Sequence, residues 1–169
     1  RHSQANARTH TGARNSRAVN NAGPAIAKVV HGPVLPAENE PTVVTARISD
    51  PNGVGSATVY YRIDPNTTYA PVTMNDSGTA GDLIANDGIY SGTIPGQAGG
   101  TMVAFYVQAT DDRGATTTFP RDASPTGFEC LVRFGETYLT SSFGTYRQWF
   151  TQNNINTWLN RPALSNEKI

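Results

Sequence analysis

The stretch NDSGTAGDLIANDGIYSG, residues 75–92, gathers the side chains best suited to chemistry. It holds Asp76, Asp82 and Asp87 among several glycines, with no Lys or Arg. Calcium takes six to eight oxygen ligands from carboxylates and carbonyls on flexible loops. The spacing departs from the EF-hand pattern, however, and Asp and Asn side chains also form turns that bind nothing. The stretch therefore predicts either a calcium site made by Asp76, Asp82 and Asp87 or an acidic turn between two strands.

Short alternating segments surround this loop and must position it. We expect strands over 25–31, 42–49, 56–63, 69–74, 88–95, 101–110, 115–120 and 128–134, separated by turn residues. The clearest alternation places Val103, Phe105 and Val107 on one face. No helical period appears between Ala25 and Phe134. The pattern predicts an all-β fold, an Ig-like antiparallel β-sandwich of seven or eight strands, with the Pro71 strand at an edge.

Sandwich topology sets where the acidic residues gather. If 42–49, 69–74 and 101–110 are strands B, D and F, the loops that follow them lie at the same end of the sandwich. These loops carry six carboxylates: Asp50, Asp76, Asp82, Asp87, Asp111 and Asp112. Such an acidic end needs solvent, a cation or a basic partner.

The chain divides into three parts on composition. Residues 1–23 form a basic polar arm with the composition of a disordered segment. Residues 24–135 form the Ig-like sandwich. Residues 136–169 form a tail, with a β-prone aromatic stretch over 138–150 and a short helix. Thr151 is the expected cap of this helix, whose Ile155, Trp158 and Leu159 fall at i, i+3 and i+4.

Charge separates the arm from the body. Residues 1–31 carry five basic side chains and no acid, whereas residues 32–169 carry the other eight basic side chains and all 13 acids. The arm has no interleaved aromatic residues and no nucleic-acid-binding motif, so we expect no nucleic acid partner. No apolar run is long enough to predict a membrane span.

The residues indicate no enzyme. There is no GxSxG elbow and no phosphate-binding glycine loop. His2, His10 and His31 lack partners at metal-ligand spacing, and Asp111-Asp112 reads as an adjacent pair in a turn. Cys130, the single cysteine, fits a small buried hydrophobic residue.

Four motifs carry a resemblance to a known family. ISDPNGVGSATVYYRID, NDSGTAGDLIANDGIYSGTIPG and VAFYVQATDDRGAT resemble the Ig-like module that precedes a CotH-kinase-like domain in large secreted bacterial proteins. GTYRQWFTQNNINTWLNRPALSNE, residues 144–167, resembles the opening of that kinase-like domain. The resemblance implies an extracellular or cell-surface location and a chain that ends inside the second domain. It also implies that the nucleotide and metal ligands of that domain lie beyond Ile169, so none is assigned.

Three functions follow as hypotheses. The first is a non-catalytic structural module that self-assembles head-to-tail into an extracellular filament, through a basic arm on an acidic end or a tail segment on a sheet edge. The second is a monomeric spacer that presents a neighbouring CotH-kinase-like domain. The third is a carbohydrate-binding module, with Tyr60, Tyr69 and Tyr106 as a stacking face.

Overall fold

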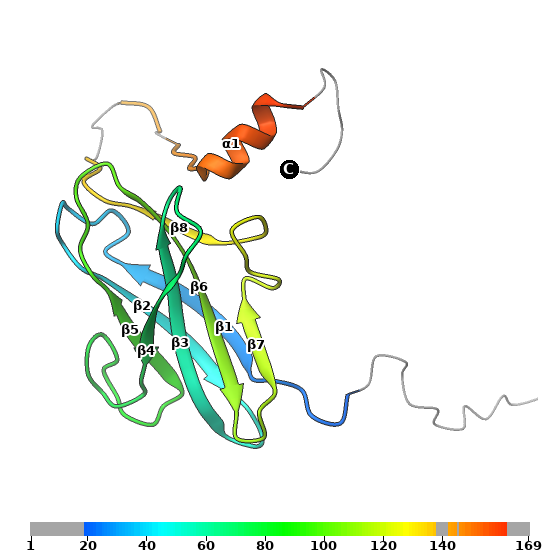
Figure 1. Ribbon diagram of the computed structural model, residues 1–169. Helices are drawn as coiled ribbons and strands as arrows, with labels where there is room; N and C mark the ends of the chain where they lie inside the picture. The colour runs from blue at the N-terminus through cyan, green and yellow to red at the C-terminus, as the bar shows by residue number, and fades with distance from the viewer. Residues whose placement is uncertain (1–18, 138–141, 145, 162–169) are drawn as a thin grey trace, which may run out of the picture.

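The computed structural model describes residues 19–137, 142–144 and 146–161 of the 169-residue chain. These residues form eight strands and one helix (Figure 1). The elements are β1 Ala25–Gly32, β2 Thr42–Ser49, β3 Val54–Ile63, β4 Ala70–Met74, β5 Ile89–Ile94, β6 Met102–Asp111, β7 Thr116–Phe119, β8 Cys130–Arg133 and α1 Gln152–Leu159. Every predicted strand is present, with its ends displaced by at most two residues.

The strands form two antiparallel sheets, as predicted for a β-sandwich. The smaller sheet has the order β1-β2-β5, and the larger has the order β4-β3-β6-β7. Strand β8 also pairs with β6, along Met102 to Phe105, while β7 pairs with its other half, Val107 to Thr110. Strands β7 and β8 therefore lie end to end along one edge of β6.

One strand assignment was wrong in detail. Strand D of a constant-type immunoglobulin domain belongs to the sheet of strands A, B and E. Strand β4, expected to be D, instead pairs with β3 in the larger sheet, where Tyr60 lies opposite Pro71. It is an edge strand, as Pro71 predicted. A single bridge, Asn75 with Ser91, then connects its end to the smaller sheet.

The core lies between the sheets and follows the period of two. In β2, Val44, Ala46 and Ile48 are buried, whereas Arg47 and Ser49 are exposed. In β6, Phe105 and its alternate neighbours are almost fully buried. The clearest deviation is at the end of β3, where Arg62 is buried and Ile63 is the more exposed residue.

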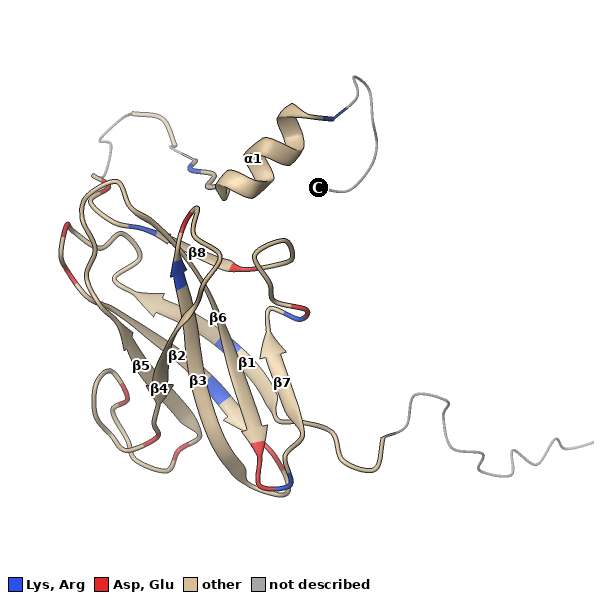
Figure 2. Cartoon of the chain, in the orientation of Figure 1, with Lys and Arg blue, Asp and Glu red and all other residues tan. Residues whose placement is uncertain are grey.

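The two ends of the sandwich differ in what they carry. The turns β2–β3, β4–β5 and β6–β7 lie at the lower end in Figure 2, and this end carries six of the 12 acidic residues in the described part of the chain. Helix α1 lies at the opposite end (Figure 1). The expected arm, except for residues 19–23, falls outside the described residues.

The described part of the tail contains the predicted helix but no strand. Thr151 is the N-cap, and its hydroxyl accepts a hydrogen bond from the Asn154 amide at 3.3 Å. Residues 142–144 and 146–150 belong to no strand. The rest of the β-prone stretch, and Pro162, lie outside the described residues. Across the described ranges, no helix has the length and apolar character to cross a membrane.

Candidate functional site

The acidic loop between β4 and β5 brings together the three aspartates that the sequence singled out. One carboxylate oxygen from each of Asp76, Asp82 and Asp87 lies within 4.8 Å of the others. Asp82 is buried, at 3% exposure, and Asp87 is exposed. The loop also folds back onto β2, because a Cβ at Gly81, where φ is +101°, would stand 2.3 Å from Val43 Cγ1. This loop therefore has a defined shape.

Backbone amides already hold each of these carboxylates. Asp82 accepts hydrogen bonds from the amides of Gly78 (2.6 Å) and Ile84 (3.2 Å). Asp76 accepts from Asp87 (3.2 Å) and Gly88 (2.9 Å), and Asp87 accepts from Ile89 (2.8 Å). The Asp82–Ile84 and Asp87–Ile89 bonds are Asx turns.

Hydrogen bonds from backbone amides therefore account for all three carboxylates without an ion. A carboxylate oxygen that accepts one amide keeps a lone pair for a cation, so the donor set is compatible with calcium. Calcium binding at Asp76, Asp82 and Asp87 stays a prediction.

The other three acidic positions lie in the neighbouring turns. Asp50 forms an Asx turn with the Asn52 amide at 2.7 Å. The β2–β3 turn touches the β6–β7 turn, because a Cβ on Gly53 would lie 2.2 Å from Asp112 Oδ2. All six predicted aspartates thus belong to one end of the sandwich, as expected from the loop order.

Asp111, like Asp82, is buried, at 3% exposure. Burial by itself raises the pKa of its carboxyl. Hydrogen bonds from the amides of Ala115 (2.8 Å) and Arg113 (2.9 Å) and from the Asn21 side chain (2.6 Å) outweigh that effect, so the pKa is lowered overall. Asn21 also accepts from the Asn52 side chain at 2.8 Å. The segment that precedes β1 is therefore fastened to the acidic end.

The three tyrosines proposed as a sugar platform do gather on the outer face of the larger sheet. Tyr60 and Tyr106 are cross-strand neighbours with stacked rings, 5.1 Å apart and 15° from parallel. Tyr69 meets Tyr106 edge-on at 5.0 Å. The rings thus pack against one another and are only partly exposed. The ring surface that would stack against a sugar is therefore partly covered by the neighbouring tyrosines.

A buried ion-pair network lies next to the tyrosines and was not foreseen from the sequence. The Arg62 guanidinium donates to Glu129 twice (2.7 and 2.5 Å), to Asp64 Oδ1 (2.9 Å) and to Asn66 O (2.9 Å). The Arg62 and Glu129 side chains are 1% and 3% exposed. Tyr69 donates its hydroxyl to Glu129 at 2.5 Å.

The network raises the pKa of both of its hydrogen-bond donors, Arg62 and Tyr69. The hydrogen bond to Glu129 raises the pKa of Arg62, against the effect of burial. Burial, followed by the bond to Glu129, raises the pKa of Tyr69. Arg62 is therefore a permanent cation, held by two carboxylates.

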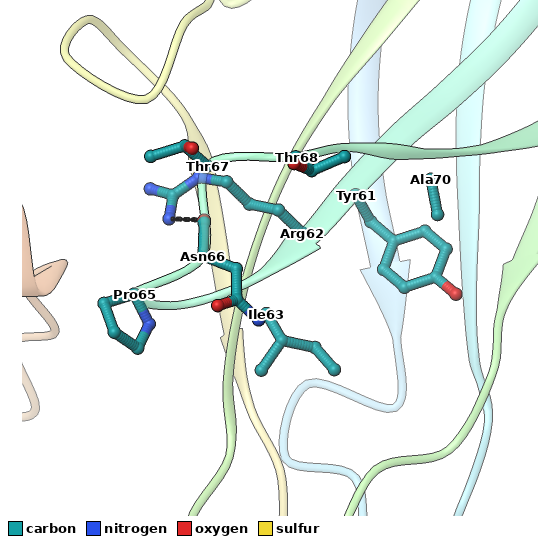
Figure 3. Close-up of a pocket in the computed structure, with 8 residues that line it drawn as sticks. All are labelled: Tyr61, Arg62, Ile63, Pro65, Asn66, Thr67, Thr68 and Ala70. Atoms are coloured by element: carbon teal, nitrogen blue, oxygen red, sulfur yellow. Dashed lines mark hydrogen bonds between the residues drawn. The ribbon is translucent and has the colours of Figure 1, made fainter.

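A hollow of about 620 Å³ opens over this network, lined by residues 61–63, 65–68 and 70. Figure 3 shows the Arg62 guanidinium directed at the 65–68 turn, with its bond to Asn66 drawn as a dashed line. Two carboxylates and one guanidinium leave this cluster with a net charge of about −1, so it is poorly suited to an anion. Its polar groups satisfy each other, and we assign it a structural role.

The N-terminus of α1 is tied to the same network. The Gln152 amide, the first of the helix, donates to Asp64 Oδ2 at 2.8 Å, and Thr151 beside it is 3% exposed. Asp64 is therefore shared between Arg62 and the helix. The sandwich fixes where α1 begins.

The remainder of α1 presents an apolar hollow of about 490 Å³. It is lined by Gln148, Phe150, Asn154, Ile155, Trp158 and Leu159. Phe150, Trp158 and Leu159 are 51%, 65% and 72% exposed, and no residue of α1 is buried. The i, i+3, i+4 face predicted from the sequence exists, but its side chains line this hollow and are not buried in the core.

Two further sequence predictions can be placed. Cys130 packs against the core next to Phe105, and burial raises the pKa of its thiol to about 11, as fits a small hydrophobic residue. His31 packs edge-on against Phe105, with ring centroids 6.0 Å apart. His2 and His10 lie outside the described residues.

The comparisons with known proteins add no relative. No model of a protein family matches the chain, and no curated protein matches its sequence. The resemblance to an Ig-like module followed by a CotH-kinase-like domain therefore stays a prediction.

Proposed function

We propose that this chain is a non-catalytic structural and interaction module, in which a rigid sandwich displays helix α1 for self-assembly. The observation that carries the proposal is the contrast along α1. Its first residues are fixed to the sandwich through Asp64 and Thr151, whereas Trp158 and Leu159 expose their apolar side chains.

This contrast favours an interaction surface. Ordering a helix without burying its apolar face gains little, because most helical stability in proteins comes from packing of that face. Exposed apolar patches on folded domains commonly mark sites of protein contact. A second molecule that covered Trp158 and Leu159 would supply the missing burial without reordering the helix.

The non-catalytic part of the proposal rests on how the polar clusters are used. The carboxylates of the acidic loop hold backbone amides. Arg62 and Glu129 hold each other and the end of α1. These roles shape and join segments of the chain. We place the module outside the cell on the strength of the resemblance in its motifs.

Sedimentation velocity over a range of concentrations tests the proposal. We expect the mass to rise with concentration, and Leu159→Asp to return the chain to a monomer. Leu159 is 72% exposed, so the variant should keep its far-UV circular dichroism. Unchanged association of a folded Leu159→Asp chain would remove α1 from the contact and overturn the proposal.

A second candidate is a monomeric spacer that presents a CotH-kinase-like domain. The motif over 144–167, which resembles the start of such a domain, includes all of α1. In this case the apolar face of α1 packs on residues of the same polypeptide. A polypeptide that also contains the CotH-kinase-like domain should then stay monomeric at every concentration. Its Trp158 should be shielded from acrylamide quenching.

A further inference from the structure

The turn between β3 and β4 contains the sequence Asn66-Thr67-Thr68, which has the pattern Asn-X-Thr with X other than Pro. This pattern is the acceptor sequence for N-linked sugars, and in secreted proteins it marks a position on the surface. The chain holds one further copy of the pattern, Asn75-Asp76-Ser77, at the start of the acidic loop. The structure distinguishes the two copies.

The first copy displays its reactive groups to solvent. Asn66, Thr67 and Thr68 are all exposed and line the hollow of about 620 Å³ (Figure 3). The backbone of Asn66 is fixed, because its amide donates to Ile63 O at 2.8 Å and its carbonyl accepts from Arg62 at 2.9 Å. Within the described part of the chain, the Asn66 carboxamide and the Thr68 hydroxyl make no hydrogen bond. An enzyme can therefore reach both groups without breaking a contact of the fold.

The second copy is held by the fold. Asn75 is half-buried and exchanges two backbone hydrogen bonds of 2.9 Å with Ser91, in the bridge that connects β4 to the smaller sheet. Its side-chain oxygen accepts from the hydroxyls of Ser77 and, at 3.4 Å, Thr79. The carboxamide and the hydroxyl of this copy are thus already paired with each other, and a transferase would have to open the loop to bind them.

From this contrast we propose that Asn66 is the acceptor of an N-linked glycan and that Asn75 is not modified in the folded chain. The donor is a sugar whose anomeric carbon carries a diphosphate, either a nucleotide sugar or a lipid-linked oligosaccharide. Asn66 Nδ2 forms a bond to that carbon, the bond from the carbon to the diphosphate oxygen breaks, and the diphosphate leaves with the electron pair. The nitrogen passes one of its two protons to a base of the transferase.

The fold accommodates this modification without loss. The Asn66 carboxamide has no partner in the described residues to give up, and the contacts that hold the turn use the Asn66 backbone instead. Changes at exposed positions away from buried contacts have little effect on stability. We therefore expect the modified and the unmodified chain to unfold at the same urea concentration.

The inference goes beyond the proposed function, because it needs neither an exposed α1 face nor a second copy. It agrees with the extracellular location proposed from the motifs. The turn lies at the end of the sandwich where α1 begins, since Asp64 beside it accepts the Gln152 amide (Figure 1). A glycan on Asn66 would decorate this end of the molecule and leave the acidic end bare.

Two transferases separate the two sources of sugar. The purified, folded chain is incubated with a nucleotide-sugar-dependent N-glycosyltransferase and its nucleotide sugar, or with a single-subunit oligosaccharyltransferase and a lipid-linked oligosaccharide. Intact-mass measurement counts the sugars, and peptide mapping locates them. A short peptide with an Asn-X-Thr sequence shows that each enzyme is active. We expect one addition, at Asn66, from at least one of the donors.

Three variants test the assignment. Asn66→Gln keeps a carboxamide but removes the pattern, and Thr68→Val keeps the shape of the side chain but removes its hydroxyl. Both positions are exposed, so the far-UV circular dichroism of each variant should be unchanged, and each should lose the addition. Asn75→Gln is the matched control and should keep it.

Three results would overturn the inference. The first is no addition from either donor while the peptide is modified. The second is addition at Asn75 to the same extent as at Asn66, because the fold would then not select between the copies. The third is an addition that persists in Asn66→Gln. The association of the Leu159→Asp chain is measured separately, so the proposed function can fail or stand whatever these results are.

Discussion

Replacing Arg62 with Met should destabilise the sandwich far more than loss of a surface charge would. The variant keeps an unbranched apolar stem but loses four hydrogen bonds, two of them to Glu129. It leaves the Glu129 carboxylate, 3% exposed, beside Asp64, 10% exposed, without a cation. Breaking a buried pair by removing one partner costs about 3–5 kcal/mol of unfolding free energy. That is a large fraction of the about 5–15 kcal/mol typical of a domain.

Urea unfolding followed by far-UV circular dichroism measures this loss. The matched control is Arg121→Met, because the Arg121–Asp122 pair is 88% and 84% exposed; its effect should stay within about 0.5 kcal/mol. A loss below about 1 kcal/mol would refute the reasoning.

A repacked variant separates charge from volume. Arg62→Met combined with Glu129→Leu and Tyr69→Phe removes the cation, its main partner and the hydroxyl that donates to that partner. Apolar replacements of buried ion pairs are often neutral or stabilising. We expect this triple variant to recover most of the lost stability. A triple variant as unstable as Arg62→Met would show that cavity formation, rather than unpaired charge, causes the loss.

Three further predictions concern the thiol and the acidic end. With its pKa near 11, Cys130 is thiolate in roughly one molecule in a thousand at pH 8, against about a quarter for an ordinary cysteine. It should therefore react roughly 200-fold more slowly with a disulfide reagent when folded than when unfolded. Equal rates would contradict its burial. The pKa of Asp111 is lowered by folding, so its contribution to stability is complete above about pH 4 and is lost as pH falls below that value; Asp111→Asn should flatten the acid limb of a stability–pH profile, and an unaltered limb would exclude this origin. The calcium hypothesis predicts a higher melting temperature in millimolar calcium that Asp82→Ala or Asp87→Ala abolishes; curves indifferent to calcium and to chelator would leave these aspartates as turn residues alone.

The strands could be predicted because their signal is local. Val44, Ala46 and Ile48 alternate with Thr45 and Arg47 because one face of β2 is buried, and turn residues mark where each strand ends. Loop order then placed the six aspartates at one end, although β4 joined a different sheet from the one expected. Neither step needed contacts between residues far apart in the sequence.

The Arg62 network could not be predicted in the same way. Arg62 and Glu129 are 67 residues apart, and alternation alone assigns Arg62 to the outer face of β3. It is buried there because the segment that carries Glu129 covers that face. Arg62 is the one charged residue of β3, and this was the available signal. Its partner depends on the path of the β7–β8 connection.

The tail shows a similar limit. The sequence predicted the helix, its Thr151 cap and the apolar face of Ile155, Trp158 and Leu159. Periodicity indicates that such a face exists, but it does not indicate what covers it. The anchoring bond from Gln152 to Asp64, across 88 residues, likewise appears only once the chain has folded.

The attachment of Asn21 to Asp111 and Asn52 has a consequence for symmetry. Asn21 therefore joins the sandwich at the same end that carries the aspartates. Contact between an arm and its own acidic end is intramolecular, and such a tethered contact is favoured over an equal one between molecules. If two copies exchanged arms, each would give and receive the same contact, so the pair would be an isologous dimer with no free arm left. Reciprocal arm exchange would therefore close at two copies and would not propagate into a filament.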